Sequence, residues 1–433
     1  MTAFAQAIRR YYDSGQFHVF FLLSTLLLKV VYILQFGDEN SGQDAPSYIL
    51  SAERIIEDGP FAEKTQAPYF PIGYSWFIAI VWKLFGRTNF SIGLFQTFLV
   101  TVALYLFYIV VSQKISKQVA TITLVLLGTN LSIAISSSLL MYESPMMSFL
   151  VIGFCLVIMA EQENSIKKWG FRITASLLFA FAITFQPKVY PATLLIVLLV
   201  VWNERKNTSA HKAIATTMIM WLFISVGPST AIYRNVAAGD GFGYTQNVST
   251  NTIRGTDRAH VKLDYSSCAS TNSYDSIGKT LCFVKVKVTN PSEGIRVTAS
   301  QAVYFWTPFI GNLKFMGTWY HSIDFRRLIP DYNWSDDNGS WSWQFDRLTG
   351  YLWSFGLVVS IIMGFTSLWK RSPNPSFVIL LIMPVLMNYL VSLLTYSEAR
   401  YRIPVMPFYT VFIAASLLNG FARLSSRQTK TNS

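Results

Sequence analysis

Four short stretches, far apart in the sequence, combine acidic, basic and aromatic residues that are suited to acid–base chemistry at a membrane surface. They are Asp44 with the Tyr48 and Ala52 that follow it, Tyr142-Glu143-Ser144-Pro145, Gln186-Pro187-Lys188, and Ser397-Glu398-Ala399-Arg400-Tyr401-Arg402. A carboxylate within reach of a hydroxyl can take its proton, and a guanidinium pairs with anions such as phosphate. A fold that brings these stretches together would hold the parts of an acid–base site.

The stretch around Asp44 lies in a segment, 37–86, that gathers much of the acidic charge of the chain. Within it, residues 47–57 have apolar side chains at helical spacing on one side and charged side chains elsewhere, which predicts an amphipathic helix. Gly59-Pro60 ends the pattern. Because a helix this short cannot span a bilayer, we expect it to lie in the interface and to hold Asp44 at the membrane surface.

The composition of the chain is that of a polytopic membrane protein. Of its 433 residues, 52% are hydrophobic and only 13% are charged, against about 25% charged in soluble domains. The net charge of +12 comes from short basic clusters between apolar runs, a pattern that sets membrane orientation. No basic stripe or recognised motif points to nucleic acid.

The basic clusters predict which ends of the apolar runs face the cytoplasm. The first run, Phe17 to Phe36, follows Arg9 and Arg10, so we expect a retained first span with a cytoplasmic N-terminus. Tyr74 to Phe85 is shorter than the ~17 residues that a span requires, and is expected to be juxtamembrane or re-entrant. The other runs are expected at 89–111, 119–138, 145–160, 170–185, 190–202, 213–233, 351–369, 377–396 and 403–421.

This topology has about ten crossings with both termini inside, provided that the short piece does not cross; it has eleven if that piece does. It divides the chain into an N-terminal membrane module (1–233), an external loop region (234–348) and C-terminal membrane helices with a cytoplasmic tail (349–433). The four polar stretches then share the external face. Polar residues at span ends are often merely solvated, but Arg400 and Arg402 oppose the positive-inside tendency and therefore suggest an anionic partner.

The cysteines and histidines point to structure and not to a metal. Cys155 lies in an apolar run and is expected to be inert, whereas Cys268 and Cys282 share one polar loop and would pair in an oxidising compartment. The histidines have no metal-ligand spacing, so no zinc site is predicted. No glycine-rich phosphate loop is present, which argues against direct use of a nucleotide.

Together, the order and spacing of these marks resemble the GT-C superfamily of membrane glycosyltransferases. The marks are the spaced Asp44, Tyr48 and Ala52, then Pro68-x-x-Pro71-x-Gly73-Tyr74, then Glu143, and the late Glu398-x-Arg400-Tyr401-x-x-Pro404-x-x-Pro407. The branch they resemble most contains dolichyl-phosphate-mannose protein mannosyltransferases and lipid A aminoarabinose transferases. The resemblance covers most spans but is patchy over 234–348.

The resemblance implies an all-α GT-C fold and an inverting transfer of a hexose or pentose from a polyprenyl-phosphate donor. The acceptor would be a glycan, lipid or protein on the non-cytoplasmic face. The resemblance requires no cofactor; it allows a divalent metal but does not indicate one. The membrane would be the plasma membrane of a bacterium or archaeon, or the endoplasmic reticulum of a eukaryote.

The resemblance also assigns roles to particular residues. Asp44 matches the catalytic aspartate of the family, and the displaced pair Asp38-Glu39 is the alternative. The candidate ligands of the donor phosphate are Arg400, Arg402, Lys188 and Lys64. The candidate substrate-binding residues are Tyr48, Tyr74, Glu143 and Tyr401. Two positions depart from the pattern, because Ile72 stands where many relatives have a second proline and Lys64 lies four residues before Pro68.

The competing function is a transporter or flippase of lipid-linked or polyanionic substrates. Transporters bind near the bilayer midplane and often show two matching halves. This sequence has no such repeat, and the spans place their acids at the external ends. A non-catalytic scaffold is a third possibility, which the groupings around Asp44 and Arg400 argue against.

Overall fold

In the structure, a computed structural model, every regular element of the described residues is a helix. The described segments are 15–36, 44–61, 70–163, 165–205, 209–237, 261–268, 276–306, 341–372, 374–395 and 399–431, with residues 253, 256, 259 and 397. This confirms the predicted all-α class. Asp38, Glu39 and Lys64 lie outside the described residues.

Most of the helices follow one another along the chain with short connections, apart from the stretches between α11 and α13 and between α14 and α17. In order they are α2 (Gln16–Phe36), α3 (Ala45–Asp58), α4 (Gly73–Phe85), α5 (Asn89–Lys114), α6 (Lys117–Gly128), α7 (Leu131–Ser138), α8 (Glu143–Ala160), α9 (Ser165–Phe185), η1 (Pro187–Val189), α10 (Tyr190–Glu204), α11 (Ala210–Ala237), η3 (Ser266–Cys268), α13 (Ser276–Thr289), α14 (Pro291–Trp306), α17 (Trp341–Arg371), α18 (Pro375–Leu394), η4 (Ala399–Val405) and α19 (Met406–Thr431).

Seven described helices are long and apolar enough to cross a membrane, and an eighth span arises if α6 and α7 count as one. These two helices are bent by 55° relative to each other, whereas the sequence pattern predicts one uninterrupted run. Asn130 begins α7 by accepting a hydrogen bond from the Ile133 amide, which is a normal helix start. The predicted span at α10 has 15 residues, and α4, with 13 residues, is the short apolar helix that was predicted.

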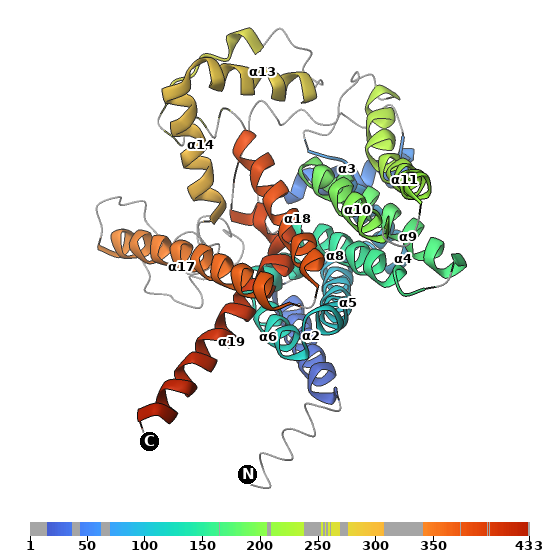
Figure 1. Ribbon diagram of the computed structural model, residues 1–433. Coiled ribbons are helices and arrows are strands. Elements are labelled where there is room, and N and C mark those ends of the chain that lie inside the picture. The colour runs from blue at the N-terminus through green and yellow to red at the C-terminus, as the bar shows by residue number, and fades with distance from the viewer. Residues whose placement is uncertain are drawn as a thin grey trace.

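The centre of the bundle is α8. Of its apolar stretch, 78% is buried inside the protein, against 28% for α2 and 17% for α17. It packs against α5, α9, α10 and η4 (Figure 1). Because Glu143 is the first residue of α8, the most enclosed helix of the bundle carries a carboxylate at its end.

The amphipathic helix predicted at 47–57 is present as α3. It buries Ala45, Tyr48, Ala52 and Ile55 and packs these residues against α4 and its surroundings. It ends at Gly59, whose φ of +97° is a backbone conformation that side chains other than glycine rarely adopt. The buried side of α3 and its end at Gly59 fix the position of the helix, and therefore also the position of Asp44, which immediately precedes it.

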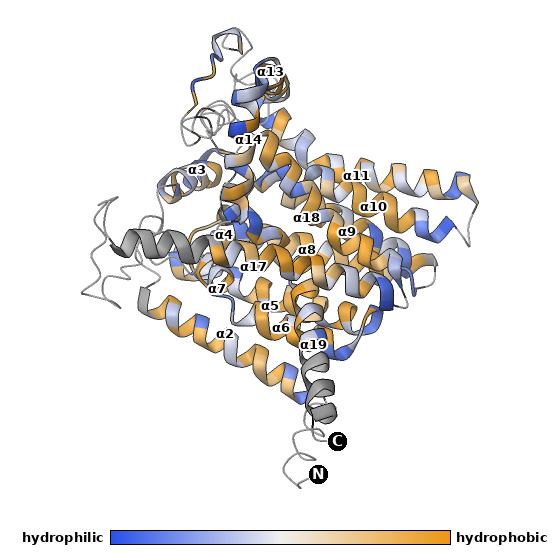
Figure 2. Ribbon diagram, turned by 60° about the vertical axis from the view of Figure 1, so that its left-hand side comes forward, coloured by the Kyte–Doolittle hydropathy of each residue, from blue (hydrophilic) through white to orange (hydrophobic). Residues whose placement is uncertain are grey.

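The two ends of the molecule differ in their elements. The start of α2 and the end of α19 lie at one end, and α13 lies at the opposite end (Figure 1). Apolar residues dominate α2, α5, α6 and α8, whereas α13 carries hydrophilic and apolar residues together (Figure 2).

Candidate active site

The site begins with the carboxylate of Asp44, which sits at the start of α3 but does not cap it. An aspartate in this position usually accepts hydrogen bonds from the first backbone amides of the helix, yet here no side-chain cap is formed. Instead Asp44 Oδ2 accepts a hydrogen bond from Arg400 Nη1 at 3.2 Å. The helix start thus presents its acid to a residue 356 positions away in the sequence.

Arg400 lies between two acids. Its Nη1 faces Asp44, and its Nε lies 3.4 Å from Glu143 Oε1. The exposed fraction of the side chain is 28% for Asp44, 15% for Arg400 and 0% for Glu143. A buried carboxylate needs a cation, so Arg400 compensates Glu143. The three side chains together carry one excess negative charge, and Asp44 is the acid that solvent reaches.

Aromatic rings form the wall beneath this cluster. The ring of Tyr48 packs edge-on against Tyr74 with centroids 5.0 Å apart, and also contacts Phe70 and Tyr142. Burial raises the pKa of Tyr48 well above its usual value, and the nearby Asp44 charge adds to this. Tyr48 therefore stays protonated, and its buried ring packs against the neighbouring aromatic rings next to the charged cluster.

Gly73 explains why the Pro-x-Gly-Tyr motif needs a glycine. A Cβ atom at Gly73 would overlap Thr184 near the end of α9, so only glycine allows α4 to begin there. The next residue, Tyr74, is fully buried and donates a hydrogen bond to Gln96 Oε1 at 2.9 Å. The motif therefore locks the first turn of α4 into the bundle.

Gln96 connects this motif to Glu143. Its Nε2 donates to the carbonyls of Ser137, at 3.2 Å, and Leu139, at 2.7 Å. Ser137 lies in the last turn of α7, and Leu139 is the first residue of the connection that leads to Glu143. Sequence analysis did not single out Gln96, although an amide inside an apolar run is a signal of a structural or functional role.

Lys188 and Arg400 approach the same aromatic ring. Lys188 Nζ lies 3.9 Å from the centroid of the Tyr401 ring, and Arg400 Cζ lies 5.5 Å from it. The Tyr401 carbonyl is held by Asn388 Nδ2 at 2.7 Å. Two cations from distant parts of the chain thus meet at one ring beside Asp44, an arrangement that suits an anionic group.

Arg402 does not join this group. Its Nη1 donates to the Phe305 carbonyl at 2.8 Å, and its side chain lines a separate cavity of about 560 Å³ with Asn130, Trp353 and Tyr409. Since η4 is a 3₁₀-helix with about three residues per turn, residues two apart point to different sides. The structure therefore brings together Asp44, Glu143, Arg400, Tyr401 and Lys188, and turns Arg402 away.

No metal site is seen in the described part of the chain, where no three His, Cys, Asp or Glu side chains are grouped closely enough to bind an ion. Arg400 contacts both acids of the site. The arrangement places a partly exposed carboxylate, that of Asp44, beside the Arg400 guanidinium.

Known proteins share a sequence segment and a fold with this chain. The family model of dolichyl-phosphate-mannose-protein mannosyltransferase matches residues 70–228. The oligosaccharyltransferase of Archaeoglobus fulgidus in its apo form superposes with a TM-score of 0.53 and 12% identity, over 96% of this chain and 52% of that one. The chain therefore shares the fold of that protein, the GT-C fold that was predicted. No curated protein matches its sequence.

A second GT-C structure is also similar. ArnT from Cupriavidus metallidurans in the apo state gives a TM-score of 0.48 at 12% identity, over 94% of this chain and 60% of that chain. The present chain thus spans about half to three fifths of the length of these proteins. The family match contains Tyr74, Glu143 and Lys188, whereas Asp44 and Arg400 lie outside it.

Proposed function

We propose that this protein transfers a sugar from a polyprenyl-phosphate carrier to an acceptor hydroxyl on the non-cytoplasmic side of the membrane, with inversion. The GT-C fold and the helices suited to crossing a membrane support a membrane glycosyltransferase. The name of the matching family, which refers to a dolichyl-phosphate-mannose donor, supports the kind of carrier. The sugar would be a hexose or pentose, and the acceptor a glycan, lipid or protein.

The observation that carries this proposal is the meeting of Asp44, Arg400 and Glu143. An acceptor hydroxyl must lose a proton as it attacks the anomeric carbon, and Asp44 is the partly exposed acid of the cluster. Arg400 holds one of its oxygens, Oδ2, which fixes the direction of the other. Glu143, fully enclosed, holds Arg400 in turn and so acts as a positioning residue.

The donor phosphate needs positive charge near the Asp44 carboxylate. Arg400 faces both acids of the cluster, at 3.2 and 3.4 Å. Lys188 is a second cation at the same place, since its Nζ lies 3.9 Å from the centroid of the Tyr401 ring, which Arg400 also approaches. We assign Lys188 the main contact to the phosphate and Arg400 a secondary one.

The loop cysteines support the non-cytoplasmic orientation. Cys268 and Cys282 form a disulfide, as predicted from the sequence, with Cα atoms 5.8 Å apart. Structural disulfides persist in oxidising compartments. Since α13 lies opposite the start of α2 and the end of α19 (Figure 1), the disulfide and the basic clusters favour the same orientation.

A transporter is the second candidate, because the bend between α6 and α7 is a broken helix of the kind that transporters use for binding. The polar side chains at this break are occupied locally. Thr129 Oγ1 donates to the Val125 carbonyl, and Asn130 accepts from the Ile133 amide. The charged cluster at α3, α8 and η4 suits chemistry better than translocation.

A donor panel distinguishes the two functions. The purified protein would be incubated with undecaprenyl-phosphate-linked hexoses and pentoses and with a membrane lipid extract as the acceptor source. Mass spectrometry would then measure released undecaprenyl phosphate and glycosylated product. We expect release coupled to product with at least one donor, and loss of both in Asp44→Asn. Movement of intact donor across proteoliposome membranes without release would contradict the proposal and support the transporter.

A further inference from the structure

The turn that carries Arg400 is held by a helical hairpin that contains none of the site residues. This hairpin consists of α13 and α14, and the turn, from the end of α18 through η4, spans residues 394–402. Three hydrogen bonds join them. They run from Lys287 Nζ to the Leu394 carbonyl (3.0 Å), from the Ser397 amide to Gln301 Oε1 (2.5 Å) and from Arg402 Nη1 to the Phe305 carbonyl (2.8 Å).

These bonds are buried, so each one is expensive to lose. Lys287 is 7% exposed and Gln301 is 1% exposed. A buried donor or acceptor that loses its partner costs the full desolvation of that group. The bonds are also distributed over the turn, at its beginning, middle and end, so together they fix its course and not merely one point.

The hairpin is rigid enough to serve as a support. A Cβ atom at Gly294 would overlap the Lys287 carbonyl, so the backbones of α13 and α14 come into close contact where the two helices meet. The Asn290 amide group closes the end of α13 by donating to the Val286 carbonyl at 2.9 Å. Lys287, which reaches the turn, therefore comes from a tightly packed position.

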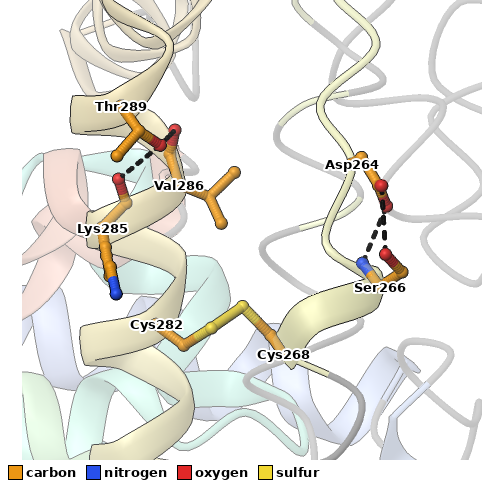
Figure 3. Close-up of a disulfide and its surroundings, with 7 residues drawn as sticks. All are labelled: Asp264, Ser266, Cys268, Cys282, Lys285, Val286 and Thr289. Carbon is orange, nitrogen blue, oxygen red and sulfur yellow. Dashed lines mark hydrogen bonds between the residues drawn. A yellow bond between two sulfur atoms is a disulfide. The ribbon is translucent and has the colours of Figure 1, made fainter.

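The disulfide extends this support outward. Cys282 lies on α13, and its bond to Cys268 ties η3 to the helix, as Figure 3 shows. Phe283 and Val286 pack with Cys268 in a small apolar cluster of their own, separate from the main core. The hairpin thus has its own core and covalent link, and contacts α18 and η4 through α14.

We infer that the α13–α14 hairpin is a clamp that positions Arg400 for the reaction, with Lys287 and Gln301 as positioning residues. This inference rests on the proposed function. Arg400 must face Asp44 and Glu143 together, at 3.2 and 3.4 Å. A shift of the turn by an ångström or so would break one contact and misdirect the Asp44 carboxylate, and displacements of this size cost large factors in rate.

The lysines of α13 offer a matched set of variants. Lys287→Met removes the donor but keeps much of the side-chain shape, and Lys287→Arg keeps a cationic donor. Lys285, two residues earlier on the same helix, is exposed, so Lys285→Met is a control for the loss of a positive charge. Gln301→Met tests the second contact independently.

Two readouts separate positioning from plain stability. Hydrogen–deuterium exchange of the peptides covering 394–402 reports the order of the turn, and steady-state kinetics with the active donor report kcat and KM. For Lys287→Met and Gln301→Met we expect faster exchange in the turn and a kcat lower by about tenfold, the size of one hydrogen bond to a charged or buried group. Lys287→Arg and Lys285→Met should stay close to the unsubstituted protein.

Faster exchange with unchanged kcat would overturn the inference, because the hairpin would then support the fold only. Unchanged exchange in both Met variants would overturn it as well. If the unsubstituted protein transfers no sugar, the proposed function fails separately. In that case hydrogen–deuterium exchange and the affinity for undecaprenyl phosphate test the clamp. The affinity of Lys287→Met should be lower than that of the unsubstituted protein, and equal affinities would contradict the clamp.

Discussion

Two charge clusters in this protein are mirror images in composition. In one, Arg400 lies between the acids Asp44 and Glu143. In the other, Glu204 lies between the bases Arg172 and Lys168. The first has an excess of negative charge and the second an excess of positive charge, although each contains three side chains.

The clusters differ most in how the chain assembles them. Lys168 and Arg172 are four residues apart on α9, and Glu204 ends α10, so the second cluster joins two neighbouring helices. The first joins α3, α8 and η4, which lie far apart in the sequence. A local cluster is sufficient to fasten adjacent helices, whereas a cluster built from three remote segments requires the whole fold. This difference is why we assign chemistry to the Arg400 cluster and a structural role to the Glu204 cluster.

Removing the central residue of the first cluster should have the largest effect on stability. Arg400→Met leaves the enclosed Glu143 carboxylate without its cation, which should lower the free energy of unfolding by about 3–5 kcal/mol. Adding Glu143→Gln should restore much of this loss, because no unpaired buried charge remains. Thermal unfolding in detergent would measure both. If the double variant is as unstable as Arg400→Met, the loss of stability does not come from an unpaired Glu143 carboxylate, and this prediction is wrong.

The corresponding change in the second cluster should be milder and silent in catalysis. Glu204 is 14% exposed, so Glu204→Gln should lower the free energy of unfolding by about 1–2 kcal/mol. Its kcat should equal that of the unsubstituted protein. Unfolding and transfer assays on the same preparation check this, and a large loss of kcat at normal stability would contradict the division between the two clusters.

Lys188 tests whether the first cluster needs added positive charge. Lys188→Met should weaken the binding of undecaprenyl phosphate by about tenfold, the value of one charge-assisted contact. Lys83, a basic residue in the last turn of α4, provides the control Lys83→Met, which should bind normally. Binding would be measured by native mass spectrometry, and equal affinities in all three proteins would refute the assignment of the phosphate to Lys188.

Lys287 should also make stability depend on pH. Burial lowers the pKa of Lys287 from 10.5 to about 8. Between these values the folded protein releases the proton while the unfolded chain keeps it, so this residue makes stability rise with pH over that window. The melting temperature of the unsubstituted protein relative to Lys287→Met should therefore increase from pH 7.5 to 9.5. A constant or decreasing difference would contradict this.

Sequence reasoning reached the class of fold and the grouping of charged residues, for identifiable physical reasons. Hydrophobic periodicity predicted the helix α3 and its apolar side through Tyr48 and Ala52, but this side packs into the protein core and not, as expected, into the membrane interface. The alternation of basic clusters placed Asp44, Glu143 and Arg400 on one face, and the structure brings these three side chains into contact. The shared polar loop predicted the disulfide between Cys268 and Cys282.

The features that the sequence did not predict depend on the direction in which a side chain points and on partners far away in the sequence. Arg400 and Arg402 are equivalent by composition, but the tight turn of η4 sends one to Asp44 and the other to Phe305. The break between α6 and α7 interrupts a run that hydropathy alone makes continuous. Gln96 and Gln301 act through backbone carbonyls and amides of other segments, and no pattern within their own helices reveals such partners.

The most direct measurement of the central claim is a double-mutant cycle on Asp44 and Glu143, read as kcat with the active donor. Asp44→Asn should lower kcat by about 10² to 10⁴, as expected for loss of a general base. Glu143→Gln should lower it less, because it disturbs only the placement of Arg400, and the double variant should be no slower than Asp44→Asn alone, since the residues act as one unit. Near-normal kcat in Asp44→Asn together with a large loss in Asp38→Asn, or strictly multiplied effects in the double variant, would contradict the account.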